Sequence, residues 1–435
     1  MGFQILCQVF ENIFKEMRRP EFVAQHRQCP ADFTRKRVLT FDMLVAFVLQ
    51  MIGGRSLQVG LDQFFGARAG GAGFARVVTK SALSQARKKL KPSAFAALCT
   101  LWVREWLAVA GEPLWHGWRV VAADGSCVRV PTWRETQDAY GVGPRQDYSV
   151  VMARVLGLFA VSSKQMLHIE IGGYDKGERG LLARCLHALS PTDLLVLDRG
   201  YPAWWLFALF AQKGIAFCAR LDSCGCGHAE VTAFVRSGKP EIVVEKCLTT
   251  KALAQLGEAG GQHAKGLKVK VRLVRVVLPS GRIEVLATSL LDSAAHPSES
   301  FAALYKSRWK IEEAFKTLKH RLHLEGFTGE LPQVIEQDIH AKVMVANITA
   351  ALSSQAQNEL PESKAATYSV NQTMAIKHWP AFLVQWMTKK GEELEQVVNN
   401  FILLLTASLN MTRRGRSCPR KFSDLGAKTP RRAYH

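Results

Sequence analysis

The sequence predicts an α/β fold in which a mixed sheet carries a β-rich insertion and has helical regions before and after it. Residues 1–112 show the period of helices, whereas residues 118–173 show the alternation of apolar and polar residues that is typical of strands. Residues 177–221 then alternate helices with short buried strands, as in a βαβ unit. With 435 residues, 48% of them hydrophobic, the chain is long enough to bury a large core and to divide into several domains.

The charge balance indicates a polyanionic partner. Fifty-seven Lys and Arg against 37 Asp and Glu give a formal net charge of +20, an excess that repels itself unless a polyanion screens it. Nucleic acid fits this best. A membrane surface is the alternative, but the longest apolar runs, such as residues 202–211, stop near ten residues, against the ~20 that a spanning helix needs. The N-terminus shows no secretory signal, so we expect a cytoplasmic protein without a membrane partner.

We expect the N-terminal region to be a helical DNA-binding domain. Residues 79–92 have a helical pattern that begins at a capping Thr or Ser and ends at Pro92. The second half of this helix would expose three consecutive bases, Arg87, Lys88 and Lys89, which we predict to contact DNA. An ordinary basic surface helix explains the same pattern equally well.

The order of elements in the middle of the chain predicts the core more closely. Three strands come first, and a helix, a strand, a helix and a strand follow. Asp124 lies in the first strand and Asp198 at the end of the fourth. This placement of two acids is the sequence pattern of a ribonuclease-H-like domain. Taken alone, Asp124 before Gly125 is as well explained as a structural turn residue.

These patterns divide the chain into five expected regions. They are a helical N-terminal domain (1–112), the first part of a catalytic core (113–213), a β-rich insertion (214–296), the second part of the core (297–360) and a helical C-terminal region (361–435). Within the fourth region, residues 298–326 have the pattern of one long helix. The basic tail at 413–435 carries eight Lys or Arg and one acid, so it should bind polyanions weakly and without sequence preference.

The long helix gathers four polar residues on one side. At roughly 100° per residue, Tyr305, Arg308, Glu312 and Lys319 fall within one narrow stripe. A lone acid on the same stripe as two bases and a phenol suits metal and phosphate binding. A surface helix with a few salt bridges fits the geometry of this helix equally well.

Three acids on three elements point to a hard divalent metal site. Asp124, Asp198 and Glu312 supply the oxygen ligands that Mg²⁺ and Mn²⁺ prefer. Two such ions about 3.5–4 Å apart can activate an attacking oxygen and stabilise the leaving oxygen on phosphorus. The sequence therefore predicts phosphodiester cleavage.

At these residues the chain resembles the DDE transposases of bacterial insertion sequences, in particular insertion-sequence family four. The resemblance rests on D-G at 124–125, on D-R-G-Y at 198–201, and on the signature Y-x2-R-x3-E-x6-K at 305–319. The predicted organisation is also similar, with a helical N-terminal part, a ribonuclease-H-like core interrupted by a β insertion, and a basic end.

The resemblance implies that Asp124, Asp198 and Glu312 bind two Mg²⁺ ions, for which Mn²⁺ can substitute. It also implies phosphate contacts around these acids, and the candidates are Tyr305, Arg308, Lys319, Arg199 and Tyr201. The implied reaction is hydrolysis at each end of the element to free a 3′-OH, which then attacks target DNA. Because two ends must be brought together, we expect a homodimer or a larger assembly on double-stranded DNA.

Two details depart from simple patterns. Some relatives form a DNA hairpin and stack a flipped base on a tryptophan of the insertion, but no Trp lies between Trp205 and Trp309. A hairpin step therefore stays open, with Phe217 and Phe234 as other aromatic candidates.

The sequence CGCGH at 224–228 could suggest zinc ligands, but its spacing favours a turn with buried thiols.

Two other classes of function remain at this stage. A ribonuclease-H-like nuclease or resolvase would use the same acids, although it would need neither the N-terminal helical domain nor the complete signature. A DNA-binding repressor or domesticated relative would keep the fold without the activity. The presence of all three acids favours the active transposase.

Overall fold

The computed structural model describes residues 2–35, 37–51, 56–69, 76–143, 150–222, 229–262 and 264–412. The chain forms two compact units that alternate along the sequence. The helical unit comprises Met1–Gly111, Val128–Ala153 and Lys316–His435, and the sheet unit comprises Glu112–Cys127 and Arg154–Phe315. The cysteines and the histidine of 224–228 and the basic tail at 413–435 lie outside the described residues. The five expected regions stay a prediction.

Seven strands make up most of the large sheet. They are β1 (Arg119–Arg129), β3 (Val150–Ala160), β4 (Gln165–Gly173), β5 (Asp193–Leu197), β6 (Ala216–Leu221), β8 (Lys268–Val277) and β9 (Ile283–Thr288). The first five stand in the order β4-β3-β1-β5-β6, and β5 runs parallel to both β1 and β6. Three leading strands followed by two parallel strands are the arrangement that the sequence predicts, so the ribonuclease-H-like core is confirmed.

Helices separate the parallel strands, as the sequence predicts. α8 (Glu178–Cys185) and the short η1 (Leu186–Ala188) precede β5, and α9 (Trp204–Gln212) leads from β5 to β6. Every residue of β5 is buried, which is typical of a parallel strand covered on both faces. The apolar residues of α9 pack into the same core as those of β1 and β5. This packing fixes the middle of β1 and the end of β5, where the predicted acids lie.

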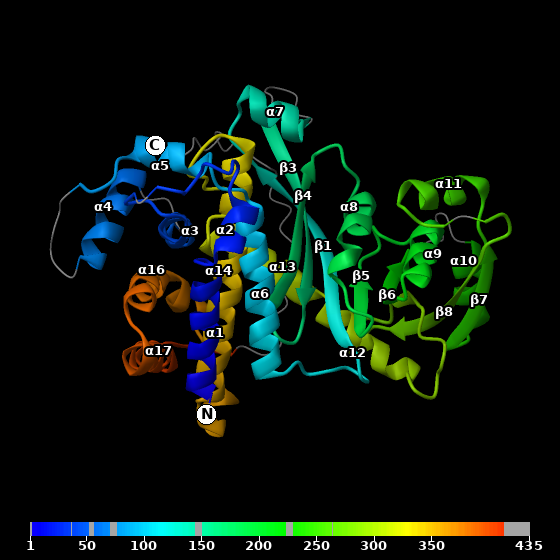
Figure 1. Ribbon diagram of the computed structural model, residues 1–435. Helices are drawn as coiled ribbons and strands as arrows, with labels where there is room; N and C mark the ends of the chain where they lie inside the picture. Colours follow the sequence, from blue (N-terminus) through cyan, green and yellow to red (C-terminus); the bar gives the residue numbers. More distant parts are fainter. Residues whose placement is uncertain are drawn as a thin grey trace. The chain divides into compact units, whose positions relative to one another are not determined.

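The predicted β-rich insertion continues the same sheet. β6 pairs with β9, β9 with β8, and β8 with β7 (Glu241–Cys247), all antiparallel. Two helices accompany these strands, α10 (Ala229–Ser237) and α11 (Thr250–Glu258), and α11 packs on α9. The insertion is thus an extension of the core sheet with its own helices (Figure 1).

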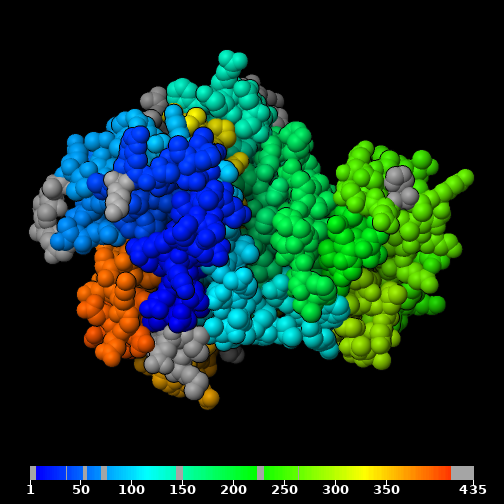
Figure 2. Space-filling model, viewed as in Figure 1, coloured from blue at the N-terminus to red at the C-terminus, as the bar shows by residue number. Residues whose placement is uncertain are grey.

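The helical unit is built around one long helix, α14 (Pro332–Asn358). It packs against α3, α6, α16 and α17, and most of its residues are buried. The N-terminal and C-terminal segments lie side by side, because α1 also packs on α17 (Figure 2). The other bounds are α1 Gly2–Glu16, α2 Pro20–His26, α3 Phe41–Gln50, α4 Leu57–Arg68, α5 Lys80–Arg87, α6 Ser93–Ala110, α7 Arg134–Tyr140, α15 Glu362–Ala365, α16 Gln372–Thr388, α17 Gly391–Thr406, β2 Val142–Gly143, β10 Tyr368–Val370 and β11 Leu409–Met411.

One helix meets the length and hydropathy of a membrane span. Among the described residues this is α6, Ser93–Ala110. Arg104 and Glu105 lie within it, and its buried side contacts α1 and α14. In the helical unit α6 therefore packs as a core helix.

The prediction of one continuous helix over 298–326 is wrong. The segment divides into η2 (Ser298–Ser300), α12 (Phe301–Ser307), α13 (Trp309–Lys316) and the π-helical η3 (Thr317–Arg321). The backbone N–H of Arg308 donates to the carbonyl three residues back, which separates α12 from α13. A π-turn has more residues per turn than an α-helix, so a spacing of 100° per residue does not extend to η3.

Candidate active site

Two of the predicted acids lie at the same level of neighbouring strands. In the parallel pair of β1 and β5, Ala123 is opposite Leu197. Asp124 and Asp198 are the next residues along the two strands. The apolar residues before them are buried, and the two carboxylates emerge together where the buried part of the sheet ends.

The third acid reaches this place through α13. Arg308, at the junction of α12 and α13, donates from Nη2 to Oε1 of Glu312 at 3.1 Å. The same nitrogen lies 4.0 Å from Oδ2 of Asp198, and the guanidinium also acts electrostatically on Asp124. Arg308 is 1% exposed. One buried cation thus links all three predicted acids.

Two further side chains hold Asp198. The hydroxyl of Tyr305 donates to its Oδ1 at 3.0 Å. Arg220, on β6, approaches the same oxygen at 3.2 Å and also donates to Glu284 on β9 at 2.9 Å. Sequence reasoning missed Arg220, although a charged residue near the end of a buried apolar strand was a signal that could have identified it.

A fourth carboxylate lies beside Asp124. Glu178 is in the first turn of α8, and its side chain packs against Gly125 so closely that a Cβ at position 125 would lie 2.6 Å from its Cδ. Arg154 is 3.8 Å from this carboxylate. Glu178 was not predicted from the sequence, where its only signal was an acid at the start of the helix after the third strand.

The environments of the two aspartates push their pKa values apart. Burial raises the pKa of Asp124 to about 6, with the carboxylates of Glu312 and Glu178 adding to the rise and Arg308 and the Gly125 N–H opposing it. Burial alone would also raise the pKa of Asp198. The Arg199 N–H, the guanidinium groups and the Tyr305 hydroxyl outweigh it, so the pKa of Asp198 is lowered. Paired acids with different pKa values are typical of catalytic sites.

The residues of this site fit a divalent metal. Asp124, Asp198 and Glu312 supply hard oxygen donors from three elements, which suit Mg²⁺ or Mn²⁺. The Nε and Nη1 atoms of Arg308 are buried and have no hydrogen-bond partner within the described structure. Two unsatisfied N–H donors beside these carboxylates suit an anionic group such as a phosphate, which would lie next to the bound metal.

The other predicted contacts of the core differ in exposure. Tyr201 is 1% exposed. Burial raises the pKa of its hydroxyl, and the charges of Glu178, Asp124 and Asp198 add to the rise. The side chain therefore lies in the interior next to the acids and not on the surface. Arg199 is exposed. Lys319 is half-buried in η3 and belongs to the helical unit.

The aromatic candidates for base stacking are core residues. Phe217 stacks on Phe207 with ring centroids 4.5 Å apart, and Phe234 is also fully buried. Their burial corrects the suggestion that either ring could receive a flipped base.

The structure corrects the expected exposure of Arg87. Its guanidinium is 3% exposed and makes a 2.7 Å ion pair with Asp338 of α14, within the helical unit. α5 therefore turns this arginine inward, and it is not available as a DNA contact. Lys88 is exposed and Lys89 partly exposed, 3.9 Å from Asp32, and their contact with DNA stays a prediction.

The chain is similar to known proteins in sequence. Residues 115–348 match the family model described as "Transposase DDE domain". The chain is similar to "Transposase InsG for insertion sequence element IS4" of Escherichia coli (strain K12), with 22% identity over 282 residues, 62% of this chain and 60% of the relative. The chain thus spans less than two thirds of that relative's length. The cryo-EM structure of a piggyBac transposase synaptic complex with hairpin DNA aligns with a TM-score of 0.47 at 10% identity, covering 97% of this chain and 88% of that one.

Proposed function

Because the chain belongs to the transposase DDE domain family, we propose that it is the transposase of an insertion sequence and cuts double-stranded DNA at the ends of its element. One observation carries the proposal. Arg308 joins Glu312 and Asp198 and acts on Asp124 within one unit, so the three acids that the family signature names share one electrostatic site.

We infer that Asp124, Asp198 and Glu312 hold two Mg²⁺ ions, for which Mn²⁺ can substitute. Divalent metal ions are general in this family. When bound, such ions activate the attacking oxygen and stabilise the leaving oxygen at phosphorus. The chain's own residues hold these ligands in place. Tyr305 and Arg220 orient the Asp198 carboxylate through its Oδ1. Ligands that are already oriented need little rearrangement during the reaction.

Arg308 has a second role in this proposal. In the metal-free site its charge balances the acids. Once metal neutralises them, we propose that the buried side chain turns toward the transposon end and donates from its unpartnered Nε and Nη1 to a phosphate, for which a guanidinium is well suited. Lys319 and the exposed Arg199 are proposed as further phosphate contacts, and Lys88 and Lys89 as contacts farther along the DNA.

The proposed reaction has two steps. Water hydrolyses the phosphodiester at each element end and frees a 3′-OH. This 3′-OH then attacks a phosphodiester of target DNA, and the bond to the target's own 3′ oxygen breaks. Two ends must be held together, so the active form is proposed to be a dimer or larger, working in the cytoplasm at the nucleoid.

The test uses the full chain with linear DNA that carries the element ends, in Mg²⁺ or Mn²⁺ and in EDTA. Strand cleavage is read on denaturing gels and end binding on native gels. Glu312→Gln should abolish cleavage and keep binding, whereas Glu313→Gln, the exposed neighbour on the same helix, should leave both unchanged. Asp198→Asn has a matched control in the exposed Asp175→Asn.

The outcomes separate the candidate functions. Metal-dependent cleavage at the element boundary that requires Glu312 supports the transposase. Specific binding without cleavage would indicate a regulator or an inactive copy. Cleavage that ignores the element ends would indicate a general nuclease, and cleavage that persists in Glu312→Gln would overturn the assignment of the acids.

A further inference from the structure

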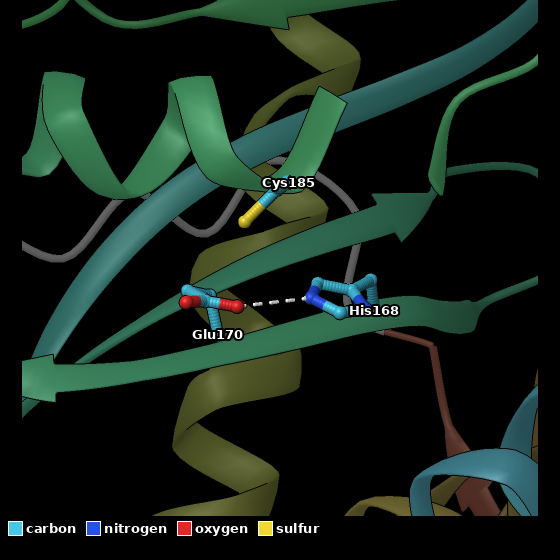
Figure 3. Close-up of side chains that lie close together, drawn as sticks. All are labelled: His168, Glu170 and Cys185. Atoms are coloured by element: carbon cyan, nitrogen blue, oxygen red, sulfur yellow. Dashed lines mark hydrogen bonds and ion pairs between the residues drawn. The ribbon is translucent and has the colours of Figure 1, made fainter. Parts of the chain in front are cut away.

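A second group of metal-ligating side chains lies on β4 and α8 of the sheet unit (Figure 3). His168 and Glu170 are two residues apart on the strand, so they point to the same face. Cys185 ends α8, which packs on β4. The ligand atoms of these three residues all lie within 4.8 Å of one another, and Nε2 of His168 is 3.3 Å from Oε2 of Glu170.

His187 extends the group. It lies in η1, and its ring meets that of His168 edge-on with centroids 5.2 Å apart. Its Nδ1 is 2.7 Å from the carbonyl oxygen of Arg184. A carbonyl only accepts, so Nδ1 carries the proton and Nε2 keeps its lone pair, the form in which a backbone-anchored histidine binds metal. His187 also acts electrostatically on Glu170, so it lies close to the group.

We propose that His168, Glu170 and Cys185, with His187 as the fourth ligand, form a zinc site between β4 and α8. Thiolate and imidazole select zinc over magnesium, which prefers oxygen. Ligand atoms around a tetrahedral zinc ion lie roughly 3.3–3.8 Å apart, given bond lengths of about 2.0–2.3 Å. The ligand atoms of His168, Glu170 and Cys185 already lie within 4.8 Å of one another, so small rotations bring them to this spacing.

The surroundings support binding and define its chemistry. Cys185 is buried, whereas the side chains of His168 and Glu170 are 22% and 23% exposed, so an ion can enter from their side. Arg184 holds the other oxygen of Glu170 at 3.1 Å, which fixes the carboxylate from behind. In the metal-free site the Cys185 thiol donates to the Leu181 carbonyl at 3.1 Å. On binding, its S–H proton passes to solvent and the sulfur bonds to zinc.

The experiment adds zinc alone to full-length protein that a chelator has stripped of metal. Zinc bound per chain is measured against a chromophoric chelator, with excess Mg²⁺ present to occupy the acid site. The expected result is one zinc ion per chain, a raised melting temperature, and no change in Asp198→Asn. Cobalt, used as a spectroscopic probe, should give a thiolate-to-metal absorption band.

Ligand variants decide the assignment. His168→Ala and Cys185→Ser should each weaken zinc binding by about 100-fold or more, since even second-shell changes cost 10–100-fold, and Cys185→Ser should lose the cobalt band. Cys247→Ser, an exposed cysteine on β7, is the matched control. His168 is partly exposed, so its variant remains informative should Cys185→Ser not fold. No zinc uptake, or uptake that neither variant reduces, would overturn the site.

Discussion

Two buried arginines, one in each unit, are surrounded very differently. In the helical unit, Arg87 donates from Nε to Gln337 at 2.8 Å, from Nη1 to Thr328, and from Nη2 to Asp338 at 2.7 Å and to the Val334 carbonyl at 3.1 Å. In the sheet unit, Arg308 donates only from Nη2, while its Nε and Nη1 have no hydrogen-bond partner in the described structure.

The difference separates a structural network from a functional one. A buried polar group without a partner costs about 1–3 kcal/mol, so a chain normally satisfies each one, as it does around Arg87. In Arg308, by contrast, the Nε and Nη1 donors have no hydrogen-bond partner in the described structure, and the three acids near them repel one another. Local arrangements that reduce stability are expected where a ligand completes the site. We therefore interpret Arg87 as a structural link between α5 and α14, and Arg308 as a group whose free N–H donors suit a DNA phosphate.

The largest expected effect is a loss of stability on replacing Arg87, whose side-chain donors are all hydrogen-bonded. Arg87→Met should lower the free energy of unfolding by about 3–5 kcal/mol, because it leaves the buried Asp338 carboxylate without its cation. Urea unfolding measures this loss. Arg104→Met is the control, because its guanidinium is exposed and, among the described residues, pairs with its neighbour Glu105, and an exposed pair contributes at most about 1 kcal/mol.

A double variant sharpens this prediction. Arg87→Met with Asp338→Leu removes both charges, and replacing a buried ion pair by apolar groups is often neutral. Stability should therefore recover in part compared with Arg87→Met alone. Equal stability of Arg87→Met and Arg104→Met would show that the network around Arg87 is not such a structural link.

The second effect concerns Arg308 and depends on metal. In EDTA, Arg308→Met should cost about 1–2 kcal/mol, less than Arg87→Met, because the acids it balances are 19–32% exposed and water partly screens their repulsion. Saturating Mn²⁺ should restore much of the loss, since the ion neutralises the same carboxylates. Melting temperatures with and without Mn²⁺ measure this, with Lys310→Met, exposed in the same helix, as control. A loss that Mn²⁺ does not reduce would contradict the role given to Arg308.

The sequence predicted the part of the site that local patterns encode. Strand periodicity and chain order placed Asp124 in the first strand and Asp198 at the end of the fourth, and the structure pairs these two strands in parallel with the acids side by side. Helix spacing placed Arg308 four residues before Glu312, where the two now pair. Both inferences rest on short-range geometry.

The remainder depends on contacts between distant segments. Arg220 contacts Asp198 from β6, and Glu178 contacts Gly125 from α8. The periodicity of a helix or a strand cannot predict such contacts between distant segments. Arg87 was expected on the surface because its partner Asp338 is 251 residues away. Lys319 lies in the π-helical η3, where the α-helical period used in its prediction does not apply, so its contact with phosphate stays a prediction.

The third prediction is a pH dependence of metal binding by the acid site. The pKa of Asp124 is raised to about 6, so below that pH its carboxyl is protonated and must lose the proton before it can bind a cation. Mn²⁺ affinity should therefore fall as the pH drops through about 6, by up to tenfold per pH unit, or about 1.4 kcal/mol. Titration calorimetry at several pH values tests this. In Asp124→Asn the affinity should be lower throughout and this step should vanish; a step that persists would assign the proton to another group.

The smallest effect tests the contact between Gly125 and Glu178. A methyl group at position 125 would lie 2.6 Å from Cδ of Glu178, so Gly125→Ala must push that flexible, partly exposed side chain away from Asp124. Stability should change by less than about 1 kcal/mol, as for most surface adjustments. Because Glu178 adds to the raised pKa of Asp124, the midpoint of Mn²⁺ binding should move to lower pH. Gly180→Ala, whose added methyl meets nothing within 4 Å, should leave the midpoint in place. If Gly125→Ala leaves this midpoint unchanged while Glu178→Gln lowers it, the prediction is wrong. The effect of Glu178 on Asp124 would then not depend on the contact between Glu178 and Gly125.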